Sequence, residues 1–156
     1  MVDGLGYGDN AKAALITRGL TEITALGAAL GANPLTFSGL AGLGDMVATC
    51  SSKLSRNHYV GLELTRGRSL EDITRGMSSV AEGIATTLVA YNLSQKLDLA
   101  MPVTESIYGV LYLGQDPRTA ALSLMAAAAE HELAGKKWNL FSFFRRKKKQ
   151  PLGPTF

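Results

Sequence analysis

The segment with the clearest chemical potential is GLGDMVATCSSKLSRN, which places many polar side chains between two apolar segments. Asp45 follows a glycine in apolar surroundings, where an unpaired carboxylate is costly. Ser55, Arg56 and Asn57 then offer a hydroxyl, a guanidinium and an amide at the predicted start of a helix. Because helix N-termini and arginine both bind anionic oxygen, the pattern predicts a site for an anionic, oxygen-rich ligand. The residue types equally allow that Ser55 only caps the helix and that Arg56 only pairs with a surface acid.

Three further patterns carry weaker chemical predictions. A nucleophile pair of Cys50 and His58 is conceivable, but Cys50 lies beside apolar residues, which favours a buried packing role. Gly4, Gly6 and Gly8 precede a helix, yet no strand comes before them and their spacing is not that of a dinucleotide-binding loop, so a flexible entry loop is the better interpretation. One cysteine and two histidines provide no zinc-ligand spacing, and no metal is expected.

Length and composition favour one globular domain. The chain has 156 residues, of which 46% are hydrophobic and 19% charged, enough material for a core. No apolar run approaches the length of a membrane span, and the first residues have no signal-peptide character. A single cysteine cannot form an internal disulfide. We therefore expect a cytoplasmic protein.

Charge is distributed unevenly along the chain. The net charge is +3, but seven basic residues and no acidic residue follow Glu132. The body of the chain up to Glu132 therefore has nine basic and thirteen acidic residues, a net charge of about −4. The positive charge belongs to the C-terminal tail, so we expect no nucleic-acid binding by the folded domain.

The apolar periodicity is helical almost throughout. A first helix is predicted to start with Asp9 or Asn10 as N-cap and to end at Gly31. Its apolar stripe consists of Leu15, Leu20, Ile23, Leu26 and Leu30. Gly19 and Gly27 lie inside this helix, where each costs about 1 kcal/mol relative to alanine. We therefore expect another helix or a ligand to come close to both glycines.

Prolines and caps mark the later helix starts. Pro34, Pro102 and Pro117 suit first turns, and Ser69 with Asp72 resembles a capping box. The sequence shows no convincing run of alternating strands and no internal repeat. The pattern predicts six or seven helices with short connections, which is an all-α multi-helix bundle.

The predicted organisation is an all-α domain over residues 1–135 and a tail over residues 136–156. The tail contains FSFFRRKKK and ends in a segment with proline and glycine. Each basic residue near an anionic membrane contributes about 1 kcal/mol of attraction, so a membrane contact is one interpretation. We expect a disordered tail, because its aromatic residues are too few to build a core.

The order of motifs resembles the C-terminal half of bacterial-type NAD(P)-dependent glycerol-3-phosphate dehydrogenase. The segments that carry the resemblance are GDNAKAALITRGL, GLGD, SRN, SSVAEGIATT, MPVTESIYGVLY and DPRTAALSLM. They cover residues 3–125 in order and without large gaps, and their combination is specific although each alone is weak. The resemblance implies the fold of the C-terminal domain of 6-phosphogluconate dehydrogenase.

The resemblance also implies an activity and partners. Enzymes of this family reduce dihydroxyacetone phosphate to sn-glycerol 3-phosphate, reversibly, with NADH or NADPH, and so supply phospholipid synthesis. They place the active site between an N-terminal Rossmann domain and the all-α domain. A homodimer is expected. The substrate-binding residues that the resemblance implies are Asp45, Thr49, Ser55, Arg56 and Asn57. The cofactor-contacting residues that it implies are Arg56, Val80 and Glu82.

Parts of the family pattern are not found in this sequence. These are the Rossmann sheet with its glycine-rich loop and the general-acid lysine, which the resemblance places upstream of Met1; Lys12 is not its counterpart. We therefore expect a start inside a longer enzyme or a fragment of one, without dehydrogenase activity by itself. The tail also departs from the family pattern.

Two alternatives remain open from the sequence. The first is a non-enzymatic helical binding or dimerisation module whose basic tail contacts a membrane or a partner. The second is a related dehydrogenase that acts on another hydroxy acid, against which the SRN and GLGD motifs argue.

Overall fold

The structure, a computed structural model, describes the backbone of residues 1–133 and the side chains of residues 1–126. Within these residues every element of regular secondary structure is a helix, and there is no strand. The α-helices are α1 (Asp9–Ala29), α2 (Asp45–Ser51), α3 (Arg56–Thr65), α4 (Leu70–Arg75), α5 (Glu82–Lys96), α6 (Pro102–Tyr112) and α7 (Pro117–Leu133). A 3-10 helix, η1 (Pro34–Ser38), and a short π-helix, η2 (Leu40–Gly44), connect α1 to α2. The predicted all-α fold is confirmed, whereas the predicted tail lies outside the described residues.

Most predicted helix starts are found where the sequence places them. Pro34, Pro102 and Pro117 each open a helix, and the Ser69 hydroxyl accepts a hydrogen bond from the Asp72 N–H at 3.1 Å. These agreements arise because proline and serine fix the first turn locally.

The N-cap predicted for the first helix is wrong by one residue. Gly8 takes the N-cap position with an extended backbone, and Asp9 is the first helical residue. There the Asp9 carboxylate lies in the first turn, where the helix dipole favours negative charge. The predicted end is close to the observed one, because Gly31 follows the helix with φ +91°, a conformation that glycine adopts without strain.

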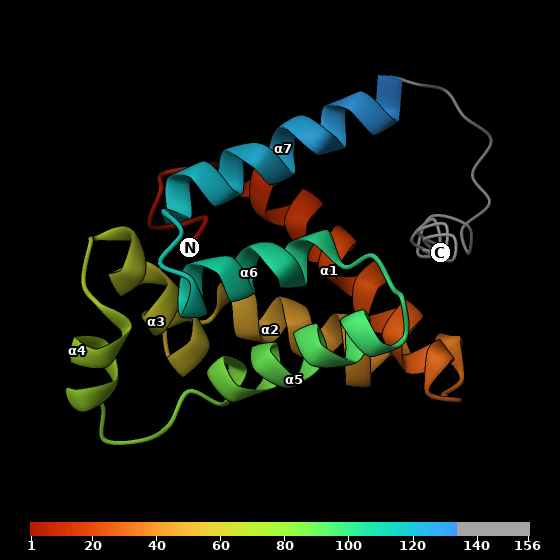
Figure 1. The fold of residues 1–156 in the computed structure, drawn as a ribbon, viewed down its shortest axis with the longest axis horizontal. Helices are drawn as coiled ribbons and strands as arrows, with labels where there is room; N and C mark the ends of the chain where they lie inside the picture. The colour runs from red at the N-terminus through yellow and green to blue at the C-terminus, as the bar shows by residue number, and fades with distance from the viewer. Residues whose placement is uncertain (134–156) are drawn as a thin grey trace, which may run out of the picture.

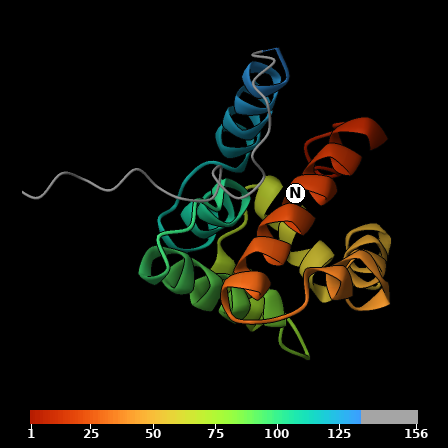
Figure 2. The same cartoon turned by 90° about the vertical axis from the view of Figure 1, so that its right-hand side faces the viewer.

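Three consecutive helices form one side of the molecule. Figure 1 shows α6 between α5 and α7, and α6 packs against both. Helix α1 packs against α6, η1 and α2. Figure 2, turned by 90°, shows α1 and α7 as two separate columns, and the Arg18 guanidinium joins them by donating to the Leu124 carbonyl at 2.7 Å. No helix in the described part is both long and apolar enough to cross a bilayer.

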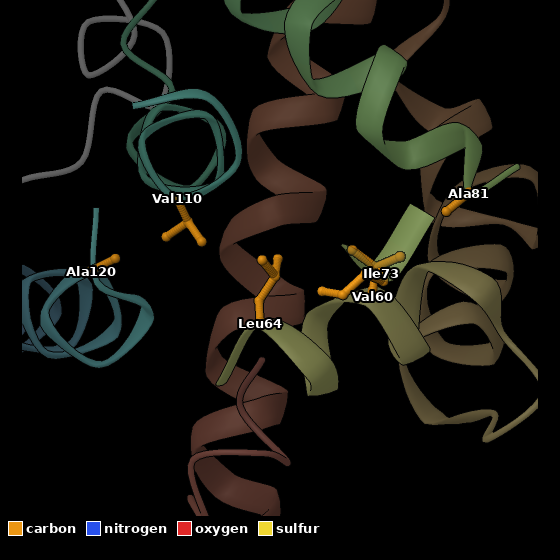
Figure 3. Packing of buried hydrophobic residues seen from close by; sticks show 6 residues of the cluster. All are labelled: Val60, Leu64, Ile73, Ala81, Val110 and Ala120. Atoms are coloured by element: carbon orange, nitrogen blue, oxygen red, sulfur yellow. The ribbon is translucent and has the colours of Figure 1, made fainter. Parts of the chain in front are cut away.

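The main core brings small and branched apolar side chains together from five segments. Figure 3 shows it between α3, α4, α6, α7 and the turn before α5. Its buried members are Val60, Leu64, Ile73, Ala81, Val110 and Ala120. A second cluster, Leu99 and Met101, packs against Leu26 of α1. The α1 stripe is only partly covered, since Ile23 and Leu30 remain 40% and 59% exposed.

The most buried side chain of α1 is a carboxylate, Glu22, which is 3% exposed. It accepts hydrogen bonds from the Val103 N–H at 2.6 Å, the Thr104 N–H at 3.0 Å and the Thr104 hydroxyl at 2.8 Å. Helix α6 has no side-chain cap of its own at Met101. Glu22 therefore satisfies the free N–H groups of α6 from another helix and fixes α1 against it.

The two glycines inside α1 have different neighbours, which leads to a paired prediction. A Cβ atom at Gly27 would lie 2.2 Å from Cζ of Phe37, whereas one at Gly19 would lie 3.6 Å from Sδ of Met46, an ordinary contact. Gly27→Ala should therefore lower the free energy of unfolding by about 1–3 kcal/mol through overpacking. Gly19→Ala should raise it by up to about 1 kcal/mol, because alanine favours the helix.

Denaturant unfolding followed by circular dichroism checks both variants in one helix. Equal effects of the two substitutions would contradict the expectation that Gly27 is required by Phe37.

Candidate functional site

A polar hollow of about 390 Å³ lies where the end of α2 meets the starts of α3 and α5. Its lining consists of Ala48, Thr49, Ser52, Leu54, Ser55, Arg56, Asn57, Val80 and Glu82. Six of the seven side chains assigned to substrate or cofactor by resemblance therefore come together in one hollow. Residues from two separated motifs, SRN and VAEG, form its walls.

The start of α3 is built by Ser55. Its side-chain oxygen accepts a hydrogen bond from the His58 N–H at 3.2 Å, so Ser55 is the N-cap of α3. The remaining N–H groups of the first turn have no partner inside the helix, and the positive end of the helix dipole lies at the hollow. The capping function that the sequence allowed is thus present, and it leaves the Ser55 hydroxyl hydrogen free to donate.

Arg56 does not pair with a surface acid within the described residues. Its Nη1 donates instead to the Val80 carbonyl at 3.2 Å, across 24 positions of sequence. This bond fixes the guanidinium at the edge of the hollow and leaves its other N–H groups available. An arginine so placed can bind an anionic ligand through two parallel hydrogen bonds.

Asn57 forms the second connection between the two motifs. Its Oδ1 accepts a hydrogen bond from the Gly83 N–H at 3.0 Å. Together with the Arg56 bond, this links the first turn of α3 to the first turn of α5. The sequence did not point to Gly83; the only indication was its place next to Glu82 in VAEG.

Glu82 opens α5 and supplies the negative charge of the hollow. Its side chain lies in the first turn, where a carboxylate is favoured by the helix dipole. Neither Glu82 nor Arg56 takes part in an ion pair within the described part of the chain. The hollow therefore offers a carboxylate acceptor and a guanidinium donor that are not paired with other charged side chains of the described residues.

Asp45 is the one predicted substrate residue that does not line the hollow. It opens α2 with an exposed side chain, one helical turn before Thr49, which does line the hollow. Its participation in the site stays a prediction.

A second, mostly apolar cavity of about 390 Å³ lies between α1, α3, α6 and α7, and it shares Thr49 and Asn57 with the polar hollow. Charged groups on its wall are already paired: the Asp3 carboxylate contacts Lys12 Nζ at 2.7 Å and His58 Nε2 at 2.9 Å. The hydrogen bond from Lys12 holds the pKa of Asp3 below its ordinary value. Lys12 is therefore paired with Asp3 and does not line the polar hollow.

Cys50 also lines the apolar cavity, and its thiol is not activated. Burial raises the pKa of the thiol above its ordinary value, so the thiolate is disfavoured. His58 is paired with Asp3 instead of Cys50. The packing role predicted for Cys50 fits this environment, and no cluster of metal-ligating side chains occurs within the described residues.

The chemistry of the polar hollow suits a phosphorylated ligand and a dinucleotide. The Arg56 guanidinium and the Asn57 Nδ2 are donors for phosphate or carbonyl oxygens, and the Glu82 carboxylate is an acceptor for ribose hydroxyls or a carboxamide. Leu54 and Val80, which also line the hollow, are 94% and 73% exposed, so apolar surface adjoins the polar groups.

Comparison with known proteins identifies the family. The sequence pattern described as the NAD-dependent glycerol-3-phosphate dehydrogenase C-terminus matches residues 1–122. Glycerol-3-phosphate dehydrogenase [NAD(P)+] from Dehalococcoides mccartyi is 70% identical over 148 residues, which are 95% of this chain and 41% of that protein. The corresponding protein of Bacillus subtilis is 56% identical over 133 residues, 85% of this chain and 39% of its own length. The Dehalococcoides alignment includes part of the segment 136–156.

A solved structure gives the same result for the fold. The crystal structure of glycerol-3-phosphate dehydrogenase from Coxiella burnetii superposes with a TM-score of 0.77 at 40% identity, covering 80% of this chain and 38% of that chain. The chain thus spans about two fifths of the length of these relatives, and these matches favour the dehydrogenase over a non-enzymatic module. The chain belongs to the NAD(P)-dependent glycerol-3-phosphate dehydrogenase family, and it corresponds to the C-terminal, all-α domain of its members.

Proposed function

We propose that this chain is the substrate-binding domain of an enzyme that interconverts dihydroxyacetone phosphate and sn-glycerol 3-phosphate with NAD(H) or NADP(H). The observation that carries the proposal is the convergence of SRN and VAEG on one hollow through the Arg56–Val80 and Asn57–Gly83 hydrogen bonds. The joining of two separated motifs at one hollow supports the proposal that phosphate and dinucleotide meet there.

Each side chain of the hollow has a role that follows from its chemistry. Arg56 compensates the charge of the substrate phosphate with its fork of N–H groups, and the N-terminus of α3 adds further donors. The Asn57 Nδ2 and the Ser55 hydroxyl donate to oxygen atoms of the three-carbon chain, and Thr49 and Asp45 complete the substrate side. Glu82 and the Val80 segment hold the dinucleotide, with Arg56 reaching both ligands.

The cofactor, when bound, would donate a hydride to C2 of dihydroxyacetone phosphate and accept one from C2 of glycerol 3-phosphate in the reverse direction. The residues of this chain hold that carbon and exclude water from it. Proton transfer at the C2 oxygen belongs to the lysine that the resemblance places outside these 156 residues. Residues on both sides of the active site are therefore required for turnover.

The exposed Leu54 and Val80 fit a further part of the proposal, a dinucleotide-binding domain that covers the hollow. Closure of that domain over an apolar rim removes water and strengthens the electrostatic contacts inside. A homodimer and a cytoplasmic location stay predictions; light scattering of the assembled protein tests the first.

A chimaera tests the proposed function directly. The N-terminal domain of the Dehalococcoides mccartyi enzyme, which is 70% identical to this chain where the two align, is joined to residues 1–156. We expect NADH or NADPH oxidation with dihydroxyacetone phosphate by the chimaera and none by residues 1–156 alone. A folded chimaera without activity, beside an active parent enzyme, would contradict the proposal. Activity of the 156-residue chain alone would contradict the proposal that residues on both sides of the active site are required for turnover.

A further inference from the structure

Asn57 and Gly83 form a contact between two helix starts that the known motifs do not explain. Gly83 is the second residue of α5, so its N–H has no acceptor inside the helix. Asn57 of α3 supplies that acceptor from another element at 3.0 Å. The bond gives the Asn57 amide a fixed partner on one side.

The identity of the partner decides which way the amide faces. A backbone N–H can only donate, so the Asn57 atom toward it is the carbonyl oxygen Oδ1. The Nδ2 group is then left for a ligand. Within the described residues it has no hydrogen-bond partner. Asn57 therefore has its Nδ2 donors available to a ligand, while its Oδ1 is held by the Gly83 N–H.

Close approach is the reason that a glycine stands at position 83. A Cβ atom there would lie 2.8 Å from Oδ1, 2.9 Å from Cγ and 3.1 Å from Nδ2 of Asn57. All three distances are shorter than ordinary contacts. The Asn57 amide is the movable part of the pair, because the other part is helix backbone. A methyl group at Gly83 would thus displace the amide and leave the helices in place.

We propose that Gly83 is a positioning residue, whose N–H and missing side chain lock Asn57 with its Nδ2 toward the substrate. The inference rests on the proposed function of Asn57 as a substrate contact. It adds a specificity rule: the substrate oxygen that the Asn57 Nδ2 recognises is a hydrogen-bond acceptor.

The test uses the chimaera only after its own activity has been measured. Failure of the proposed function is therefore distinguished from failure of the inference about Gly83. Gly83→Ala should lower kcat/KM for dihydroxyacetone phosphate about 100-fold, the typical cost of misplacing a group by about 1 Å. The KM for the reduced dinucleotide should stay within about twofold. Gly8→Ala is the matched control, because a Cβ atom at Gly8 meets nothing within 4 Å and the loop does not line the hollow. It should leave both parameters unchanged.

A double-mutant cycle shows whether Gly83 acts through Asn57. In an Asn57→Ala background the shorter side chain leaves room for a methyl group. Adding Gly83→Ala to that background should therefore lower kcat/KM for dihydroxyacetone phosphate by less than about twofold. An undiminished loss in that background, or a loss confined to the KM of the dinucleotide, would overturn the inference.

Asn57→Asp gives an independent check that does not alter the backbone. The aspartate keeps an acceptor for the Gly83 N–H but replaces the Nδ2 donors by a negative oxygen. We expect an unchanged thermal midpoint and a loss of kcat/KM for dihydroxyacetone phosphate at least as large as that of Gly83→Ala. Retention of more than half of the activity would show that Nδ2 is not the substrate contact.

Discussion

Arg56→Lys should reduce kcat/KM for dihydroxyacetone phosphate by roughly 100-fold in the active chimaera, even though the charge is kept. The loss corresponds to about 3 kcal/mol, the order expected when a charge-assisted pair of hydrogen bonds is removed. Lysine offers a point charge and cannot reproduce the planar fork that binds two phosphate oxygens.

The structure adds a second cause to this loss. Arg56 uses Nη1 to hold the Val80 carbonyl at 3.2 Å while its remaining N–H groups lie at the hollow. A lysine can serve one of these functions but not both. We therefore expect weaker binding of both substrate and dinucleotide, seen as raised KM values for each in steady-state kinetics.

Arg75→Lys is the control for Arg56→Lys. Arg75 pairs with Glu71 and Asp72 on the exposed surface of α4, and it does not line the hollow. The control should change kcat/KM by less than about twofold, since surface substitutions of this kind have small effects. A similarly small effect of Arg56→Lys would contradict the role given to Arg56.

Local patterns predicted the helices well because their causes are local. Proline at Pro102 and Pro117 and the cap at Ser69 fix first turns by geometry and hydrogen bonds between close neighbours. The error at Asp9 is also local, because the observed N-cap is the adjacent residue, Gly8. Such boundaries depend on small differences in backbone preference.

Contacts between distant residues were not predictable in the same way. The motifs SRN and VAEG were each visible in the sequence, but the bonds from Arg56 to Val80 and from Gly83 to Asn57 depend on how α3 and α5 pack. Glu22 is the strongest example. The missing cap of α6 was visible at Met101, yet nothing in the sequence indicated that a carboxylate 79 positions earlier supplies it.

Replacing Glu22 should have the largest effect on stability. Glu22→Ala removes three hydrogen bonds to the start of α6 and leaves two partly buried backbone N–H groups without an acceptor. We expect a loss of about 3 kcal/mol in the free energy of unfolding, measured by denaturant titration of residues 1–156. The exposed Glu71 provides the control, because Glu71→Gln should cost no more than about 0.5 kcal/mol. Equal costs for the two positions would contradict the role of Glu22.

The effect of Glu22 should also depend on pH, with a defined sign. Burial raises the pKa of Glu22 above its ordinary value of 4.5, so folding favours the protonated side chain. This contribution is fully present below pH 4.5 and is lost as the pH rises through the elevated pKa of the folded state. Glu22→Gln does not titrate, so the stability advantage of the original chain over this variant should shrink as the pH is raised.

The lowered pKa values of Asp3, Glu63 and Asp116 give the opposite trend, with stability that increases with pH. The original chain and the Glu22→Gln variant both contain these three carboxylates. Their contribution therefore cancels when the two unfolding free energies are subtracted at each pH. Denaturant unfolding of the pair from pH 4 to pH 8 therefore isolates Glu22. A difference that stays constant, or grows with pH, would mean that hydrogen bonds to the carboxylate outweigh its burial. In that case the ionised form of Glu22 would be the one that joins α1 to α6.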